Sequence, residues 1–176
     1  MALILTGSTT LEQHVSRLQS DPESYRPARC PHCGRAGPWC HGHYPRKADR
    51  DTGHLNPIVI PRFRCPHCRA TCSVLPECIP PRRWYLWAVQ AVVLVGVLAG
   101  ASLRRLSRAL APGRHTMRRW MARWRAGFPL HAFHLRNRLP ELGRHPDMAA
   151  FWPATLACLS LGGAMHRLHL DGVAIP

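Results

Sequence analysis

The chain has 176 residues, which is enough for one ordinary domain or for two small ones that support each other. Its 24 lysine and arginine residues outweigh 9 acidic residues, so the formal net charge is +15 with histidine neutral. An excess of this size predicts an anionic partner, either nucleic acid or an acidic membrane surface. All but one of these cations are arginine, whose planar fork matches phosphate and guanine better than an ammonium group does.

Eight cysteines would suit a secreted scaffold held by disulfides, but the first residues argue against that class of protein. The stretch MALILTGSTTLEQHVSRL lacks a basic leader, a long apolar core and a small-residue cleavage site. Cysteine pairs in a chain without an export signal predict a metal site in a reducing compartment. We therefore expect a cytoplasmic protein.

In chain order, the first predicted part is residues 1–27, with a short strand at Ala2–Leu5, a helix from about Thr10 to Gln19 and a proline-bearing linker. The second part, residues 28–80, holds the cysteine pairs, many prolines and glycines, and short β-like runs. The two prolines that close it suit the first turn of a following helix.

The word CPHC occurs twice, at Cys30–Cys33 and at Cys65–Cys68. A thiolate pair at this spacing holds one zinc ion from a single tight turn, and a second pair completes a tetrahedral shell. We predict a zinc ribbon in which Zn2+ is held by Cys30, Cys33, Cys65 and Cys68. Residues 34–64 must then form a loop or hairpin of their own. A redox dithiol is the alternative, but it needs one pair at a helix start rather than two matching pairs.

Other metal-binding residue types lie nearby and could join or replace a ligand: Cys40, His41, His43, His54 and Cys72. Cys72 falls in the apolar stretch TCSVLP, which favours a small buried thiol.

Cys78 and Cys158 are interpreted as buried or free thiols. The histidines inside the CPHC words, His32 and His67, are expected to face solvent or a phosphate. Because a four-thiolate site leaves no open metal position, it favours a binding module over an enzyme.

The stretch WYLWAVQAVVLVGVLAGA, residues 84–101, has Gln90 as its one clearly polar residue. Its length is at the lower edge of the ~20 residues that a membrane span needs, and arginines flank both ends, so no orientation is indicated. We interpret it as a buried helix, with a membrane span as the alternative. The basic, amphipathic sequence that follows supports the buried helix.

Two amphipathic helices are predicted in GASLRRLSRALAPGRHTMRRWMARWR, residues 100–125. Ser102 is a good N-cap for the first helix, and Thr116 is predicted to cap the second. One apolar stripe with helical spacing runs along the second helix: Met117, Trp120, Met121 and Trp124. Two short helices with a tight turn predict a helix-turn-helix over residues 81–127, in which the preceding apolar stretch is the first helix of a three-helix bundle.

The polar side of these helices is basic. Between Ile79 and Pro140 there are twelve arginines and no aspartate or glutamate, whereas a solvated helical surface normally mixes both signs. This asymmetry predicts a phosphate-facing surface, with arginines accumulated through codon bias as the alternative. The residues expected to contact DNA are Arg104, Arg105, Arg108, Arg114, His115, Thr116, Arg118, Arg119 and Arg123. Trp120 and Trp124 are expected in the core rather than as stacking platforms.

The last part, residues 128–176, is interrupted by prolines that predict only short pieces: Pro129, Pro140, Pro146 and Pro153. One helix is expected at Phe151–Leu161, ended by Gly162 and Gly163. The predicted fold class is therefore small α+β, with a zinc ribbon, a helix-turn-helix three-helix bundle and a short helical tail whose role does not follow from the sequence.

The order of these motifs resembles a known family. CPHCG, FRCPHCRATCSVLP, PPRRWYL, GASLRRLSRAL and HTMRRWMARWR together are similar to the N-terminal zinc-ribbon and helix-turn-helix region of bacterial insertion-sequence transposases, and of small stand-alone proteins related to that region. The resemblance covers about residues 28–127. It implies DNA binding, with the metal at the four CPHC cysteines and recognition by the helix that starts near Thr116.

One departure from that family bears on activity. Transposases of this kind carry three separated carboxylates that hold two metal ions for strand transfer. After Arg138 the acidic residues are only Glu141, Asp147 and Asp171, in a proline-broken tail that cannot form a sheet-based nuclease fold. We therefore expect a zinc-dependent DNA-recognition module without catalysis, acting in the nucleoid as a transposon accessory protein or transcriptional regulator.

Three alternatives stay open. The chain could be a non-catalytic subunit or remnant of a transposase whose catalytic chain is separate, a membrane-anchored zinc protein, or an adaptor that binds another protein. The expected partner is double-stranded DNA, with a separate transposase catalytic chain and a homodimer left open. No small-molecule substrate is expected.

Overall fold

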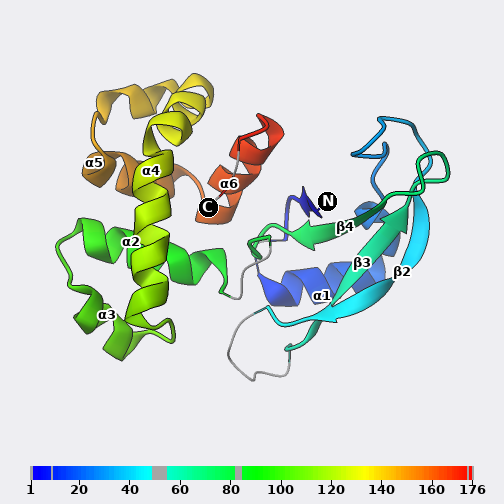
Figure 1. Cartoon of the computed structure of the whole chain (residues 1–176), viewed down its shortest axis with the longest axis horizontal. Coiled ribbons are helices and arrows are strands. Elements are labelled where there is room, and N and C mark those ends of the chain that lie inside the picture. Colours follow the sequence, from blue (N-terminus) through cyan, green and yellow to red (C-terminus); the bar gives the residue numbers. More distant parts are fainter. Residues whose placement is uncertain (1, 9, 49–54, 82–84, 174, 176) are drawn as a thin grey trace. The chain divides into compact units, whose positions relative to one another are not determined.

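The computed structural model describes residues 2–8, 10–48, 55–81, 85–173 and 175. The chain divides into two compact units, Met1–Leu86 and Trp87–Pro176 (Figure 1). The first unit is built on a four-stranded sheet, whereas the second is helical. The predicted mixture of α and β structure is therefore confirmed. Residues 1–27 and the cysteine region share the first unit, while the tail beyond residue 128 shares the second unit with the helices before it.

The sheet of the first unit has the strand order β1-β4-β3-β2. Its strands are β1 (Ala2–Leu5), β2 (Trp39–Arg46), β3 (Ile58–Arg64) and β4 (Thr71–Pro76). β1 runs parallel to β4, whereas the β2–β3 and β3–β4 pairs are antiparallel. The first strand lies where the sequence predicts it, and the insert between the CPHC words forms the expected hairpin through β2 and β3.

Helix α1 (Leu11–Ser20) begins with a capping box. The Thr10 hydroxyl accepts a hydrogen bond from the Gln13 amide and the Gln13 side chain accepts one from the Thr10 amide, each at 3.2 Å. The buried imidazole of His14 links α1 to Tyr25 and to strand β3. Its Nδ1 lies 2.5 Å from the Tyr25 hydroxyl and its Nε2 lies 2.9 Å from the Val59 carbonyl oxygen. Helix α1 is thereby held against β3, across one face of the sheet (Figure 1).

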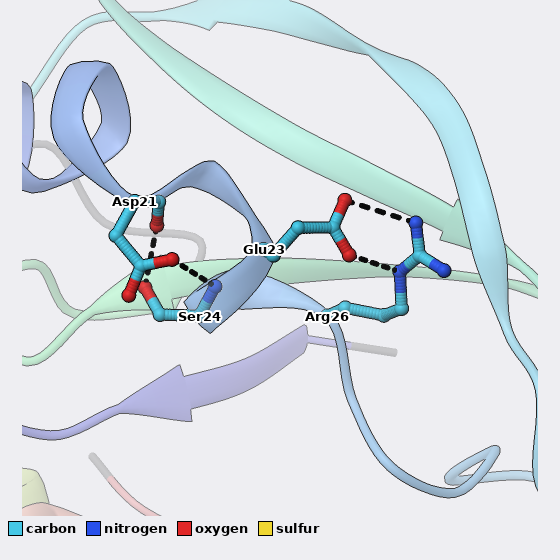
Figure 2. Close-up of polar contacts among 4 residues, drawn as sticks. All are labelled: Asp21, Glu23, Ser24 and Arg26. Carbon is cyan, nitrogen blue, oxygen red and sulfur yellow. Dashed lines mark hydrogen bonds and ion pairs between the residues drawn. The ribbon is translucent and has the colours of Figure 1, made fainter.

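The short 3₁₀ helix η1 (Pro22–Tyr25) follows α1, and Figure 2 shows its polar contacts. The Asp21 carboxylate accepts a hydrogen bond from the Ser24 amide at 3.2 Å, and Arg26 forms an ion pair with Glu23 at 2.9 Å. These contacts turn the chain so that the Tyr25 ring enters the core under the sheet, where it packs with Phe63, Cys72 and Val74. Two acidic side chains of this unit are therefore engaged within the η1 turn.

The second unit contains α2 (Trp87–Leu98), α3 (Leu103–Ala109), α4 (Arg114–Arg138), η2 (Pro140–Arg144), α5 (Met148–Cys158) and α6 (Leu161–Leu170). Helix α2 packs against α3, α4, α5 and α6, which buries Trp87, Val93 and Leu94. The apolar stretch therefore forms a core helix of 12 residues, covered by more neighbours than the expected two.

The apolar helices of the second unit bear on the alternative of a membrane span. Among the described residues, no single helix combines the length and apolar character needed to cross a bilayer. Helices α5 and α6 reach that length and composition only as a pair, and their axes differ in direction by 97° at the break between them.

Helix α4 extends well past the predicted boundary at residue 127. Pro129 lies inside the helix, which continues to Arg138. A proline removes one helical hydrogen bond, but here the ring lies on the exposed side, while His131, Ala132 and Leu135 are buried on the other side. Packing of these three side chains outweighs the local break, so the expectation that Pro129 ends a helix is wrong. Pro153 is likewise accommodated inside α5.

The predicted helix at Phe151–Leu161 is confirmed in part, because α5 covers most of this segment, but the predicted glycine stop is wrong. Helix α5 ends at Cys158, and a new helix starts directly afterwards. The Ser160 side chain caps α6 by accepting a hydrogen bond from the Gly163 amide at 2.9 Å. Gly162 and Gly163 are buried in the first turn of α6, so they begin a packed helix rather than terminate one.

Tryptophan rings form the centre of the second unit. The Trp124 ring centroid lies 5.0 Å from that of Trp152, 6.4 Å from that of Trp87 and 5.9 Å from that of His131. All three tryptophans are fully buried, and Trp120 is 5% exposed. The edge-to-face arrangement is the geometry that aromatic pairs prefer. The prediction that Trp120 and Trp124 belong to the core is confirmed.

Candidate functional site

The four cysteines of the CPHC words come together in space. The Sγ atoms of Cys30 and Cys68 are 3.6 Å apart, as are those of Cys33 and Cys65. All four sulfur atoms lie within 4.8 Å of one another. Each close pair joins one cysteine from each word, so the cluster links two segments that are about thirty residues apart in the chain.

Two copies of one turn bring the thiols into this arrangement. In the first turn the Cys30 amide donates to the Arg35 carbonyl at 2.8 Å, and the Gly34 amide donates to the Cys30 carbonyl at 2.9 Å. The second turn repeats both hydrogen bonds at 3.0 Å, with Cys65, Arg69 and Ala70 in the equivalent positions. A β-bridge between residues 29 and 36 flanks the first turn, and the β3–β4 ladder flanks the second.

The sulfur cluster has the size of a tetrahedral thiolate site. Zinc–sulfur bonds of about 2.3 Å place the corners of a tetrahedron about 3.8 Å apart, close to the observed separations. Cys30 and Cys65 are buried, whereas Cys33 and Cys68 are exposed at the tips of the turns. The donor set and its geometry therefore fit a metal ion bound by four cysteines.

Backbone amides favour the thiolate form that a metal ion requires. Hydrogen bonds from the backbone of Cys68 and then His67 lower the pKa of the Cys65 thiol to about 7. The Ala70 amide acts in the same direction on Cys68, but burial and the three neighbouring thiols raise its pKa to about 12. A cluster without metal therefore retains protons, which a bound cation would displace.

The competing ligands do not join this cluster in the part of the chain that the structure describes. Cys40, His41 and His43 are exposed along β2, while His54 lies outside the described residues. Cys72 is buried in the core beside Phe63, and burial raises its pKa. The expectation of a small buried thiol at Cys72 is confirmed.

The remaining thiols and the turn histidines also lie as predicted. Cys78 is buried, which raises its pKa to about 12, and Cys158 is exposed at the end of α5. His32 and His67 are exposed on the two CPHC turns. The His67 Nδ1 atom lies 3.4 Å from the Arg35 guanidinium, which bridges one turn to the other.

The predicted DNA-contacting residues occupy the outer side of α3 and α4. Eight of them are exposed: Arg104, Arg105, Arg108, Arg114, His115, Arg118, Arg119 and Arg123. Thr116 is half-buried. Met117, Trp120, Met121 and Trp124 form the buried side of α4, which confirms the predicted stripe. We refer to the eight exposed residues as the basic helix face.

The arginines of the basic helix face form no ion pair with a described residue. Among the described residues, no carboxylate lies within ion-pair distance of any of them. The arginines at the end of α4 differ, because Arg138 pairs with Asp171 and Arg136 donates to the His145 carbonyl at 2.7 Å. The pairing lowers the pKa of Asp171 through the Arg138 hydrogen bond. Cations near the start of α4 are therefore left to solvent or to a partner.

The helix caps around this face are only partly as predicted. Ser102 caps α3 by accepting a hydrogen bond from the Arg105 amide at 3.2 Å. Thr116 does not cap α4, because the helix already begins at Arg114 with Gly113 at the N-cap and without a side-chain cap. Helix α3 packs closely on α2, where a Cβ atom on Gly96 would lie 3.0 Å from the Leu106 side chain.

Sequence reasoning did not single out one further surface, on the sheet of the first unit. Phe63, Cys72 and Val74 are buried on the side of α1, and the residues between them alternate to the other side. Cross-strand pairing joins Arg64 to both Trp39 and Thr71, and Arg62 to Ser73. We call this surface the open sheet face: Trp39, His41, Arg62, Arg64, Thr71 and Ser73. The alternation in RFR and TCS is the sequence signal that predicts it.

Comparison with known proteins assigns the chain to a family without a known activity. A family model described as a domain of unknown function, DUF6431, matches residues 30–120. The match begins at the first cysteine of the cluster and ends within α4 at Trp120, and it spans just over half of the chain. No curated protein and no solved structure shows a significant match. The chain therefore belongs to the DUF6431 family.

Proposed function

We propose that this chain is a non-catalytic DNA-binding protein, in which a zinc ribbon supports recognition of duplex DNA by a helix-turn-helix. The observation that carries the proposal is the basic helix face, where arginines on α3 and α4 have no acidic neighbour among the described residues. Arginine forks pair with phosphate oxygens and with the major-groove edge of guanine. A surface of this composition suits the DNA backbone and grooves.

The metal proposed for the cysteine cluster is Zn2+. Four soft thiolates in a tetrahedral arrangement select zinc or an iron–sulfur centre, and two tight CPHC turns are typical of zinc. All four positions of the shell are filled by protein, so the ion would have a structural role. The sulfur atoms join the β3–β4 turn to the segment before β2. Zinc binding would therefore stabilise the fold of the first unit.

The helix-turn-helix is proposed for α3 and α4, with α2 as the supporting helix. These three helices contact one another pairwise, and residues 110–113 form the tight connection between α3 and α4. The start of α4 would enter the major groove and lead with Arg114, His115 and Arg118. Its opposite side is held in the core by Trp120 and Trp124, so the helix is presented on a rigid support.

The arrangement favours a transposase-like recognition module over a catalytic subunit. Two of the three acidic residues in the second unit have structural roles: Asp147 caps α5 at 2.8 Å from the Ala150 amide, and Asp171 pairs with Arg138. A chain of this kind would serve a transposon as an accessory protein or regulate transcription. A separate catalytic chain could supply strand transfer.

An in vitro selection from random duplex DNA with zinc-loaded protein, at two salt concentrations, tests this function. An enriched motif that persists at the higher salt supports sequence-specific recognition, and a palindromic motif would indicate a dimer. Binding that yields no motif and disappears with salt would leave only charge attraction and would contradict specific recognition. A matched selection with a Cys33→Ala variant shows whether recognition needs the metal site.

A further inference from the structure

We propose that the open sheet face is a second nucleic-acid site, which binds single-stranded DNA by stacking an unpaired base on Trp39. This site lies on the first unit and uses none of the residues of the basic helix face. The choice of DNA rather than RNA rests on the proposed function, whereas the preference for a single strand follows from the chemistry of the surface.

Trp39 offers a large aromatic ring on an edge strand. Its side chain is 45% exposed at the start of β2, a strand whose residues are exposed or half-buried throughout. The His41 ring meets it edge-on, with centroids 5.3 Å apart and planes at 81°. This contact orients the indole and adds a second ring beside it. Aromatic rings on an exposed sheet face are the usual platform on which unpaired bases stack.

Cations and hydroxyl groups lie on the same face of the two strands next to β2, with the cations on β3 and the hydroxyl groups on β4. Arg64 lies directly across the β2–β3 ladder from Trp39, and Arg62, two residues before Arg64 on β3, lies on the same face. The Arg62 guanidinium lies 6.0 Å from the centre of the Tyr44 ring, which holds it above β2. Thr71 and Ser73 add hydroxyl groups on β4. Arginine beside an aromatic ring suits a strand whose phosphates alternate with stackable bases.

Acidic residues are absent from this part of the described first unit. Glu12 lies in α1, Asp21 and Glu23 are engaged at η1 (Figure 2), and Glu77 is buried after β4. The strands β2, β3 and β4 and both CPHC turns contain no carboxylate. The open sheet face therefore combines positive charge with an aromatic ring. This combination is complementary to a nucleic acid whose bases are unpaired and free to stack.

A single strand fits this surface better than a duplex. Bases in a duplex stack on each other, so their faces are hidden from a tryptophan on a protein surface. An unpaired base exposes its π-face and can rest on the indole of Trp39 while adjacent phosphates reach Arg62 and Arg64. The basic helix face contains no tryptophan, tyrosine or phenylalanine, so it suits duplex phosphates and groove edges instead.

Fluorescence anisotropy with zinc-loaded full-length protein tests the proposal. The single-stranded probe is an oligothymidylate of about 12 nucleotides, within the usual site size for such surfaces, and the second probe is a mixed-sequence duplex. Trp39→Ala should weaken oligothymidylate binding about tenfold and leave duplex binding unchanged, since stacking is lost only for the single strand. The matched control is Phe133→Ala, which removes a similarly exposed ring from α4 and should change neither affinity.

Two further variants separate this site from the basic helix face. Arg62→Ser with Arg64→Ser should reduce the salt dependence of oligothymidylate binding, whereas Arg119→Ala with Arg123→Ala should weaken only duplex binding. Trp39→Phe should retain most of the affinity for the single strand because phenylalanine also stacks. Zinc content and circular dichroism confirm that each variant is folded.

The binding results distinguish failure of the stacking site from failure of the proposed function. Unchanged oligothymidylate binding by Trp39→Ala, or an equal loss on both probes, would overturn the stacking site. Tighter binding of oligouridylate than of oligothymidylate would overturn the assignment to DNA. If the protein binds single strands through Trp39 but shows no duplex binding, this site is supported and the proposed function is contradicted. If it binds duplex DNA but its single-strand affinity does not depend on Trp39, the proposed function is supported and this site is contradicted.

Discussion

Gly34 and Arg69 occupy equivalent positions in two copies of one turn and share a left-handed backbone, with φ of 71° and 60°. Each amide donates to the carbonyl of the first cysteine of its turn, Cys30 or Cys65. Glycine adopts this conformation freely, whereas a residue with a Cβ atom is strained in it. Among the described residues, Arg69 is the one non-glycine residue with positive φ. The second turn therefore keeps a charged side chain where glycine would be more stable.

Replacing Arg69 with glycine should raise the free energy of unfolding of the zinc-loaded protein by about 0.5–1 kcal/mol, because relief of strain outweighs the added freedom of the unfolded chain. The converse change, Gly34→Ala, should lower it by about 1 kcal/mol, although nothing lies within 4 Å of the new methyl group. Denaturant unfolding with excess zinc measures both changes. A less stable Arg69→Gly variant would show that contacts of the arginine side chain exceed the strain.

Loss of any one of the four clustered thiols should abolish metal binding. The single variants Cys33→Ala and Cys65→Ala should each reduce bound zinc from one ion per chain to none and disorder both CPHC turns, because the three remaining thiolates no longer enclose the ion. Metal analysis of dialysed protein measures the stoichiometry. Cys40→Ala and Cys158→Ala remove exposed thiols outside the cluster and serve as controls that keep the zinc. Retention of one zinc ion by Cys65→Ala would refute the ligand set.

Arg119→Ala should weaken binding to a selected site by about 1–3 kcal/mol if the side chain reads a base edge, and should weaken non-specific binding much less. Arg144→Ala is the matched control, since it removes an exposed arginine of the same unit outside the basic helix face. Titrations with specific and scrambled duplexes at several salt concentrations provide the comparison. An equal loss on both duplexes would reduce Arg119 to a phosphate contact.

Gly127 permits the close packing of His131 inside the second unit. A Cβ atom on Gly127 would lie 2.5 Å from the imidazole Cε1 of His131, whose ring is buried between Trp124 and Trp152. Gly127→Ala should therefore destabilise the protein by about 1–3 kcal/mol, despite the better helix propensity of alanine. Gly143→Ala faces open space and should change stability by only a few tenths of a kcal/mol. Thermal unfolding of the two variants gives the difference, and equal stabilities would contradict the packing.

His14 should make the first unit less stable in mild acid. Burial lowers its pKa below the ordinary value of 6.5, an effect that the Val59 carbonyl partly offsets. The unfolded chain therefore gains a proton at this histidine at a higher pH than the folded chain does. The contribution of neutral His14 to stability is complete above pH 6.5, and it is lost as the pH falls through the lower folded-state pKa.

The measurement for His14 compares unfolding free energies at about pH 7.5 and about pH 5.5. The drop on acidification should be smaller in His14→Gln than in the parent protein, whereas His43→Gln, which changes an exposed histidine on β2, should retain the full drop. The comparison cancels the release of zinc in acid, which both variants share. Identical pH profiles for the two variants would exclude His14 as the group responsible.

Local features of the chain could be predicted because neighbouring residues determine them. The first helix starts near Thr10 and Ser102 caps α3, as the sequence predicts, and the stripe from Met117 to Trp124 is buried. The two CPHC turns repeat the same backbone hydrogen bonds. Each of these signals spans only a few residues, and its energetic reason lies within a single turn or a single helix face.

The predicted helix ends are wrong where tertiary packing outweighs the local preference of a residue. Pro129 normally indicates the end of a helix, but the buried side chains from His131 onward keep α4 helical to Arg138. Gly162 and Gly163 normally indicate a stop, but the Ser160 cap and their burial make them the start of α6. Neither the continuation of α4 nor the start of α6 can be predicted without knowing which helices pack against these segments.

The sequence by itself identified the four cysteines that cluster, the excess of arginine over carboxylates and the apolar side of α4, because these depend on residue type and spacing. Only the tertiary structure decided the parallel pairing of β1 with β4, the inclusion of residues 128–176 in the helical unit and the position of Trp39 across from Arg64. These relationships join residues far apart in the chain. Their stability comes from burial of apolar surface and from ladder hydrogen bonds, which exist only once the distant segments have met.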